Sequence, residues 1–138
     1  MKYFELDPEV PCQLGPRTLM DVNLHPPVIY KLHVIFDGWL GNDLLTNFPV
    51  YLVTPSLGDS LSQINLTGFE LRECEVEKSD LFSELYPSCK LPHFKWLFIN
   101  GNSSQDFYIS PQYNLCVSER ALQELEKFNL QNCGIVKI

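Results

Sequence analysis

Short apolar runs with the spacing of β-strands dominate this chain. Between Val28 and Phe36 every even-numbered position is apolar, whereas Lys31 and His33 interrupt the odd-numbered set. Alternation with a period of two is typical of a strand with one buried face, so we predict a strand from Val28 to Phe36. Two further runs, residues 48–53 and 94–99, have the length and composition of strands. The Asn-Gly pair at 100–101 favours a tight hairpin turn that leads back into a strand at 107–109.

Helical signals follow three of the predicted strands or connections. Thr54 is a good N-cap, Pro55 suits the first helical position, and apolar residues recur at helical spacing to residue 64, which predicts a helix ending near Asn65. Ser118 takes the same cap position before a helix whose apolar stripe is residues 121, 125 and 128. A third, short helix begins after Ser79.

The chain appears to repeat one unit. A shift of 64 residues aligns the segment 53–71 with the segment 117–135, and both are predicted to form strand, cap, short helix and strand. The identical pairs under this shift are Val53 with Val117, Leu61 with Leu125, Asn65 with Asn129, and Leu66 with Leu130. We therefore consider an internal strand-helix-strand repeat, although a strand that runs into a capped helix is also a common local unit.

The remaining segments are less regular. Five prolines in residues 1–27 predict an irregular N-terminal segment that packs on the body of the domain, with one short edge strand around residues 3–6. The apolar positions change parity between Phe69 and Val76, which a straight strand cannot accommodate, so a bulge or break is expected at Arg72-Glu73. Residues 135–138 are expected to form a final strand.

These elements predict the fold class. The 138 residues suit a single domain spanning 1–138 with a hydrophobic core of its own. Many short strands with about three short helices, and no regular alternation between them, favour an α+β domain with a mixed or mainly antiparallel sheet.

Charge and composition exclude several classes of function. The net charge of −7 repels phosphate backbones, so a nucleic acid is not expected as a ligand, and a basic protein partner fits better. Acids and a proline interrupt the apolar residues of the N-terminus, and no stretch has the length of a membrane span, so we expect a cytoplasmic protein without membrane contact. Five cysteines without CxxC spacing favour reduced thiols, with Cys74, Cys116 and Cys133 in the core.

Candidate catalytic and metal-binding residues are few. The histidines His25, His33 and His93 lack ligand spacing, and we expect structural or solvent-facing roles for them. Cys89 lies in a polar loop without a thiolate-stabilising neighbour. No nucleophile elbow, phosphate-binding loop, dinucleotide fingerprint or calcium loop is present in the sequence. We therefore expect no catalytic residue, no metal and no cofactor.

Several segments resemble a known group of bacterial proteins. Residues 26–33, 36–45, 48–54 and 66–70 look like a group of small uncharacterised bacterial proteins, and Val117-Ser118-Glu119-Arg120-Ala121-Leu122 resembles immunity family eleven of bacterial polymorphic toxins and its double-CxxCG relatives. The likeness covers most of the chain after residue 25. The chain has no CxxCG motif, so the metal site of those relatives is not implied.

This resemblance implies a non-catalytic immunity protein that binds and neutralises a cognate secreted toxin in the cytoplasm. Such toxins include nucleases, which are usually basic and would be steered toward a chain of charge −7. The most acidic segment of the sequence and one tryptophan are then the candidate interface. These residues are Glu73, Glu75, Glu77, Asp80, Glu84 and Trp39. A solvated acidic face is the alternative for the acids, and a lid over the core is the alternative for Trp39.

Two other classes of function stay open. A small cytoplasmic enzyme or ligand-binding domain would have a pocket that converges on His33 or His93 with perturbed acids. A structural or regulatory interaction domain with no toxin partner is the third reading.

Overall fold

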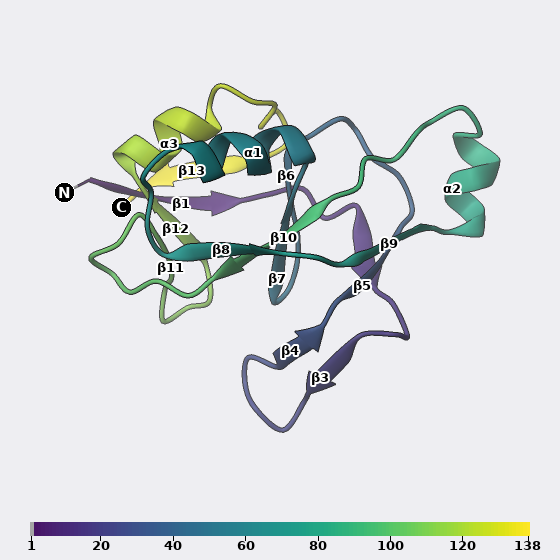
Figure 1. Ribbon diagram of the computed structural model, residues 1–138, viewed down its shortest axis with the longest axis horizontal. Helices are drawn as coiled ribbons and strands as arrows, with labels where there is room; N and C mark the ends of the chain where they lie inside the picture. The colour runs from purple at the N-terminus through teal and green to yellow at the C-terminus, as the bar shows by residue number, and fades with distance from the viewer. Residues whose placement is uncertain (1) are drawn as a thin grey trace.

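The computed structural model describes residues 2–138 and has an α+β fold (Figure 1). Within that range the chain forms one domain of thirteen strands and three short helices, and no helix there is long and apolar enough to cross a membrane. The strands are β1 Tyr3–Asp7, β2 Cys12–Leu14, β3 Leu19–Asp21, β4 Val28–Lys31, β5 His33–Phe36, β6 Leu44–Asn47, β7 Val50–Val53, β8 Phe69–Arg72, β9 Glu75–Lys78, β10 Lys95–Ile99, β11 Phe107–Ile109, β12 Leu115–Ser118 and β13 Gly134–Lys137. The helices are α1 Pro55–Gln63, α2 Asp80–Leu85 and α3 Glu119–Leu125.

Two four-stranded antiparallel sheets share one plan. Their strand orders are β6-β7-β10-β8 and β11-β12-β1-β13. In the first sheet the unit β7-α1-β8 leaves a space between its two strands, and β10 lies there, antiparallel to both. In the second sheet β1 lies in the same way between the two strands of the unit β12-α3-β13. The registers also agree. Leu97 of β10 lies opposite Tyr51 and Leu71. Leu6 of β1 lies opposite Leu115 and Ile135, which are 64 positions after Tyr51 and Leu71.

The predicted internal repeat is therefore present in the structure, and it is longer than the sequence indicates. Each unit also includes a preceding hairpin strand, β6 or β11, and a central strand. The central strand follows β8 in one unit but begins the chain in the other. The two ends of the chain are adjacent, since the backbone N–H of Ile138 donates to the carbonyl of Tyr3 at 3.1 Å (Figure 1). Contrary to expectation, the strand at residues 3–7 is not an edge strand, because both of its neighbours are provided by the C-terminal half.

Two aspartates link the repeated units. Asp43 precedes β6 and Asp106 precedes β11, and each carboxylate accepts from the N-cap hydroxyl of one helix and from a backbone N–H that follows the other helix. The contacts are Asp43 with the Thr54 hydroxyl at 2.5 Å and the Asn129 N–H at 2.8 Å, and Asp106 with the Ser118 hydroxyl at 2.6 Å and the Thr67 N–H at 2.9 Å. Helices α1 and α3 are thereby fixed next to each other, where the Ser60 hydroxyl also donates to Glu124.

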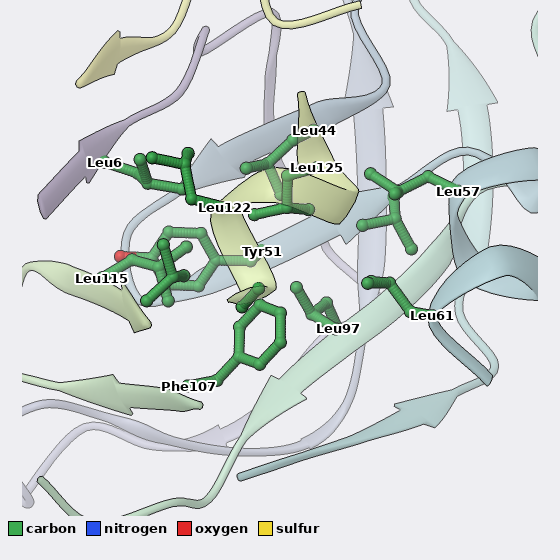
Figure 2. Close-up of a cluster of buried hydrophobic side chains, with 13 residues drawn as sticks. Leu6, Leu44, Tyr51, Leu57, Leu61, Leu97, Phe107, Leu115, Leu122 and Leu125 are labelled. Carbon is green, nitrogen blue, oxygen red and sulfur yellow. The ribbon is translucent and has the colours of Figure 1, made fainter. Parts of the chain in front are cut away.

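The hydrophobic core has two parts, one on each face of the sheet β6-β7-β10-β8. Figure 2 shows the first part, where Leu57 and Leu61 of α1 and Leu122 and Leu125 of α3 meet the strands. The second part lies on the opposite face, because the alternate residues of the same strands point there. Its fully buried members include Leu45, Leu52, Phe36, Phe82 and Phe94.

Two smaller sheets complete the fold. Strands β2, β5 and β9 form a three-stranded sheet in which β5 and β9 are parallel, and β3 and β4 form a separate hairpin that projects from the body (Figure 1). The single strand predicted for residues 28–36 is wrong. Val28 and Tyr30 of β4 are exposed and Ile29 is buried, but from Leu32 onward the even positions are buried. The chain passes from one sheet to another at Leu32, which reverses the parity.

Of the other local predictions, some are confirmed and some are wrong. The caps Thr54 and Ser118 are confirmed, since each side chain accepts from a backbone N–H in the first turn of its helix. The helix predicted after Ser79 is confirmed as well, and Ser79 is its N-cap. The strand break is confirmed, although it falls at residues 73–74. The strand predicted around residues 3–6 is present as β1, but the irregular structure predicted for the rest of the N-terminal segment is wrong within the described residues 2–27, because β2 and β3 also form there. Asn100-Gly101 is not a hairpin turn: both N–H groups donate to the Gly68 carbonyl, and β11 pairs with β12.

Candidate functional site

The structure separates the five candidate acids into three settings. Glu75 and Glu77 lie on β9 beside β5, and Glu73 lies in the break before β9. Glu73 accepts hydrogen bonds from Lys95 at 2.5 Å and contacts His93 at 3.3 Å, which lowers its pKa. Asp80 and Glu84 are exposed on α2, and in residues 2–138 neither forms an ion pair. The acids therefore do not form one uniform negative surface.

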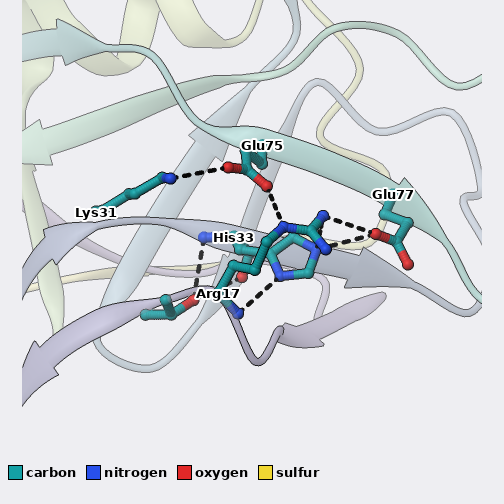
Figure 3. Close-up of polar contacts among 6 residues, drawn as sticks. Arg17, Lys31, His33, Glu75 and Glu77 are labelled. Carbon is teal, nitrogen blue, oxygen red and sulfur yellow. Dashed lines mark hydrogen bonds and ion pairs between the residues drawn. The ribbon is translucent and has the colours of Figure 1, made fainter.

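Cations neutralise the β9 acids locally (Figure 3). Arg17 donates to Glu75 at 2.6 Å and to Glu77 at 2.9 Å, and Lys31 lies 3.1 Å from the other oxygen of Glu75. Hydrogen bonds from Arg17 hold the pKa of both glutamates below the ordinary value, and the same contacts raise the pKa of Arg17. Arg17 precedes β3 and Lys31 ends β4, so these ion pairs join the base of the β3–β4 hairpin to the sheet.

His33 also lies at the attached end of the β3–β4 hairpin. Its ring is fully buried, and its Nδ1 accepts from the backbone N–H of Arg17 at 3.2 Å. Nε2 of the ring lies 3.2 Å from the Glu77 carboxylate and 3.1 Å from the Arg17 guanidinium. Thr18 both donates to the carbonyl and accepts from the N–H of His33, at 2.8 and 3.0 Å. His33 is therefore enclosed by polar partners, as expected for a structural histidine.

Gly15 allows this arrangement. Its N–H donates to the His33 carbonyl at 2.7 Å, and a Cβ at this position would lie 2.1 Å from Nδ1 of the His33 ring. Only a residue without a side chain fits against the buried ring. The stretch 15–18 is thus a rigid attachment for the hairpin.

The hairpin itself is the most exposed apolar feature of the described residues. Six large apolar side chains on β3, β4 and the loop between them are more than a third exposed: Leu19, Met20, Val22, Leu24, Val28 and Tyr30. Exposed apolar side chains concentrated on one projecting element are typical of a protein interaction site. Sequence reasoning missed it because residues 1–27 were expected to lie on the body.

Trp39 has the role of a lid over the second core cluster. Its indole N–H donates to the Asn42 carbonyl at 2.8 Å, and its ring meets the ring of Phe94 edge-on with a centroid distance of 5.7 Å. The neighbouring Leu40 is 66% exposed. Of the two apolar side chains in this loop, Leu40 is therefore the one available to a partner.

Three of the five thiols belong to the protein interior. Cys12, Cys74 and Cys116 are buried, and burial raises the pKa of Cys12 to about 12 and that of Cys74 to about 11. Cys133 is only half-buried. Among residues 2–138, no three side chains of the histidine, cysteine, aspartate and glutamate types are grouped so that they could hold a metal ion.

An uncharged groove lies next to the hairpin. It has a volume of about 330 Å³ and is lined by residues of β4, β7, β10 and β11, including Ile29, Tyr51, Trp96 and Ile109. Comparisons of the chain with protein-family models, with curated proteins and with solved structures gave no match.

Proposed function

We propose that this chain is an immunity protein that binds and neutralises a basic toxin in the cytoplasm, as the resemblance of its sequence implies. The observation that supports this proposal best is the projecting β3–β4 hairpin, whose six exposed apolar side chains stand beside acidic residues at its base. Protein interfaces combine an apolar centre with a polar rim, and this surface has both.

The apolar and acidic residues have different tasks in this proposal. The net charge of −7 attracts a basic toxin over a distance and raises the rate of association. Burial of Leu19, Val22 and Tyr30 then holds the complex together, because removing apolar surface from water stabilises a complex and a few central residues carry most of the binding free energy. Asp80 and Glu84, which form no ion pair within residues 2–138, are the candidate acids best placed to meet cations of the toxin.

The ion pairs at the base support this assignment. Glu75 and Glu77 already bind Arg17 and Lys31, so a toxin would gain little by replacing these partners. Their contribution is to hold the hairpin in one orientation. An ordered hairpin loses less conformational entropy on binding than a flexible loop does.

The proposal implies that a neighbouring gene encodes a basic secreted toxin, and the test is binding to the product of that gene, measured by calorimetry after co-expression. The variant Leu19→Ser/Val22→Ser/Tyr30→Ser removes three side chains that are 59, 68 and 66% exposed. Its matched control is Val10→Ser/Val136→Ser/Ile138→Ser, at positions that are 60, 60 and 55% exposed elsewhere on the molecule.

We expect the hairpin variant to bind at least about 30-fold more weakly, corresponding to about 2 kcal/mol, and the control to bind like the wild type. Replacing Asp80 and Glu84 by lysine should weaken binding mainly at low salt. Equal binding by the hairpin variant and the wild type would contradict the assignment of the surface. A wild-type chain that neither binds nor protects against the toxin would contradict the function.

A further inference from the structure

One residue holds the attached end of the β3–β4 hairpin. Four hydrogen bonds join the stretch 15–18 to His33 of β5. The Gly15 N–H and the Thr18 hydroxyl donate to the His33 carbonyl, and the His33 N–H donates to the Thr18 oxygen at 3.0 Å. The fourth bond is to the ring, where the Arg17 N–H donates to Nδ1 at 3.2 Å. The protonation state of this ring therefore affects how the hairpin is attached.

A charged ring does not fit this place. A neutral imidazole has one nitrogen that accepts a hydrogen bond, whereas both nitrogens of an imidazolium are donors. Protonation of Nδ1 would direct its N–H at the N–H of Arg17 and remove the hydrogen bond between them. The His33 ring is fully buried, and a Cβ on Gly15 would lie only 2.1 Å from Nδ1, so no space remains there for a water molecule to accept the new proton.

The charged groups around the ring offset one another (Figure 3). On the Nε2 side the Glu77 carboxylate of β9 lies 3.2 Å away and the Arg17 guanidinium lies 3.1 Å away. Glu77 favours a positive charge on the ring, and Arg17 opposes it. Beyond them, Glu75 of β9 is paired with Arg17 and with Lys31 of β4. These two carboxylates and two cations leave the balance to burial and to the donor at Nδ1, and both favour the neutral ring.

We propose that protonation of His33 releases the stretch 15–18 from β5, so that the orientation of the β3–β4 hairpin depends on pH. Proton uptake sets the direction of the effect. While the stretch is attached, the ring stays neutral. Once the stretch has separated, water reaches the ring and the ring takes up a proton. Acid therefore favours the detached state, because a state that binds more protons gains stability as the pH falls.

The change belongs to the range between about pH 8 and pH 5, where histidine is the side chain that ordinarily changes its charge. The neighbouring carboxylates do not account for a change in this range. Hydrogen bonds from Arg17 hold the pKa of Glu75 and that of Glu77 below the ordinary value of 4.5, so both stay ionised. The pH dependence is thus assigned to the buried ring.

The consequence concerns the exposed apolar residues of the hairpin. Leu19, Val22 and Tyr30 lie beyond the attached end, so their positions depend on it. A hairpin that is held in one orientation loses less conformational entropy on binding than a mobile one does. A partner that uses this surface should therefore bind more weakly in acid. Only this last step rests on the proposed function, whereas the attachment itself is tested on the free chain.

The first experiment uses the ¹⁵N-labelled variant His25→Asn/His93→Asn, in which His33 is the only histidine, and follows it by NMR from about pH 7.5 to about pH 5.5. Ring ¹⁵N shifts report protonation. Hydrogen exchange, expressed relative to an unstructured chain at the same pH, reports opening. One proton taken up per opening changes the equilibrium by at most about tenfold per pH unit. We expect the protection of the Arg17 and His33 amides to fall about tenfold as the ring is protonated, and the amides of the sheet β6-β7-β10-β8 to keep theirs.

The variant His33→Asn removes the titrating group. Its side-chain oxygen still accepts from the Arg17 N–H, but the amide takes up no proton, so we expect the protection of the Arg17 amide to be independent of pH. His25→Asn/His93→Asn is the matched control and should keep the pH dependence of the wild type. If His33→Asn fails to fold, the control chain is sufficient by itself, because its single ring is observed directly. Protection that stays constant across the pH range in this chain, with or without protonation of the ring, would overturn the inference.

Toxin binding at the two ends of this pH range separates the inference from the proposed function. Weaker binding in acid by the wild type but not by His33→Asn would support both. If the hairpin loosens in acid while the toxin binds equally well at both pH values, the inference stands and the hairpin is not the toxin contact. If no toxin binds at either pH, the proposed function fails, while loosening of the free chain in acid still supports the inference.

Discussion

Replacing one of the two linking aspartates, Asp106→Asn, should destabilise the protein far more than the equivalent change at Asp43. The Asp106 carboxylate is almost completely buried and accepts five hydrogen bonds. Two of them come from Thr67, one from Ser118 and two from the Arg120 guanidinium. Asp43 accepts hydrogen bonds only from Thr54 and Asn129 among residues 2–138 and has no arginine partner there.

The magnitude follows from counting acceptors. An asparagine keeps one oxygen, and its amide nitrogen turns donors toward the donors of Thr67 or Arg120. Hydrogen bonds to a charged group contribute about 1.5–3 kcal/mol each, but the Arg120 side chain is 60% exposed, so its share is reduced by solvent screening. We expect the free energy of unfolding to fall by roughly 3 kcal/mol for Asp106→Asn and by about 1 kcal/mol for Asp43→Asn.

Denaturant and thermal unfolding at pH 7 measure these losses. At roughly 3 °C per kcal/mol for a domain of this size, Tm should fall by about 10 °C in the first variant and about 3 °C in the second. Hydrogen bonds from Arg120 hold the pKa of Asp106 below its ordinary value of 3.8. A group with a lowered folded-state pKa stabilises the fold above the unfolded-state value, and this contribution is lost as the pH falls through the folded-state value.

The difference in the free energy of unfolding between the wild type and Asp106→Asn should therefore be largest at pH 7 and should decrease below about pH 4. Equal losses for the two aspartates, or a difference that does not change with acidification, would refute the reasoning from hydrogen bonds.

Two further predictions concern the base of the hairpin and the thiols. Gly15→Ala should destabilise the protein by about 1–3 kcal/mol through overlap with the buried His33 ring, whereas Gly38→Ala, where a Cβ would meet nothing closer than 3.7 Å, should be nearly neutral. His33→Ala should largely remove the effect of Gly15→Ala in a double-mutant cycle, and additive losses would exclude the proposed overlap. In the native protein a thiol reagent should modify the partly exposed Cys89 much faster than Cys12 and Cys74. The reason is that burial raises the pKa of Cys12 to about 12 and that of Cys74 to about 11. Mass spectrometry of the labelled peptides measures the rates, and equal rates would contradict the prediction.

Local signals in the sequence were sufficient for the helices. Thr54, Ser79 and Ser118 could be recognised as caps because a cap depends on residues within one turn of itself. The 64-residue repeat was visible for a similar reason, since equivalent core positions such as Leu61 and Leu125 require the same residue. The fold class, an α+β domain, followed from these elements.

Strand partners depend on contacts that are distant in the sequence. Tyr3–Asp7 looks like an edge strand, yet it is central because β12 and β13 supply its neighbours from the other end of the chain. The run from Val28 to Phe36 reads as one strand, but the pairing of its two halves with different partners reverses the buried face at Leu32.

The candidate site shows the same division. The sequence located the acids Glu73, Glu75 and Glu77 and gave the net charge, which are properties of composition and order. It did not indicate that Arg17, 58 residues away from Glu75, binds that glutamate, or that the apolar residues of β3 and β4 project from the body. Caps, periodicity and net charge are thus determined by the sequence alone, because they arise between near neighbours or from simple sums. Which charges are paired and which apolar residues stay exposed is decided only when tertiary packing brings distant segments together.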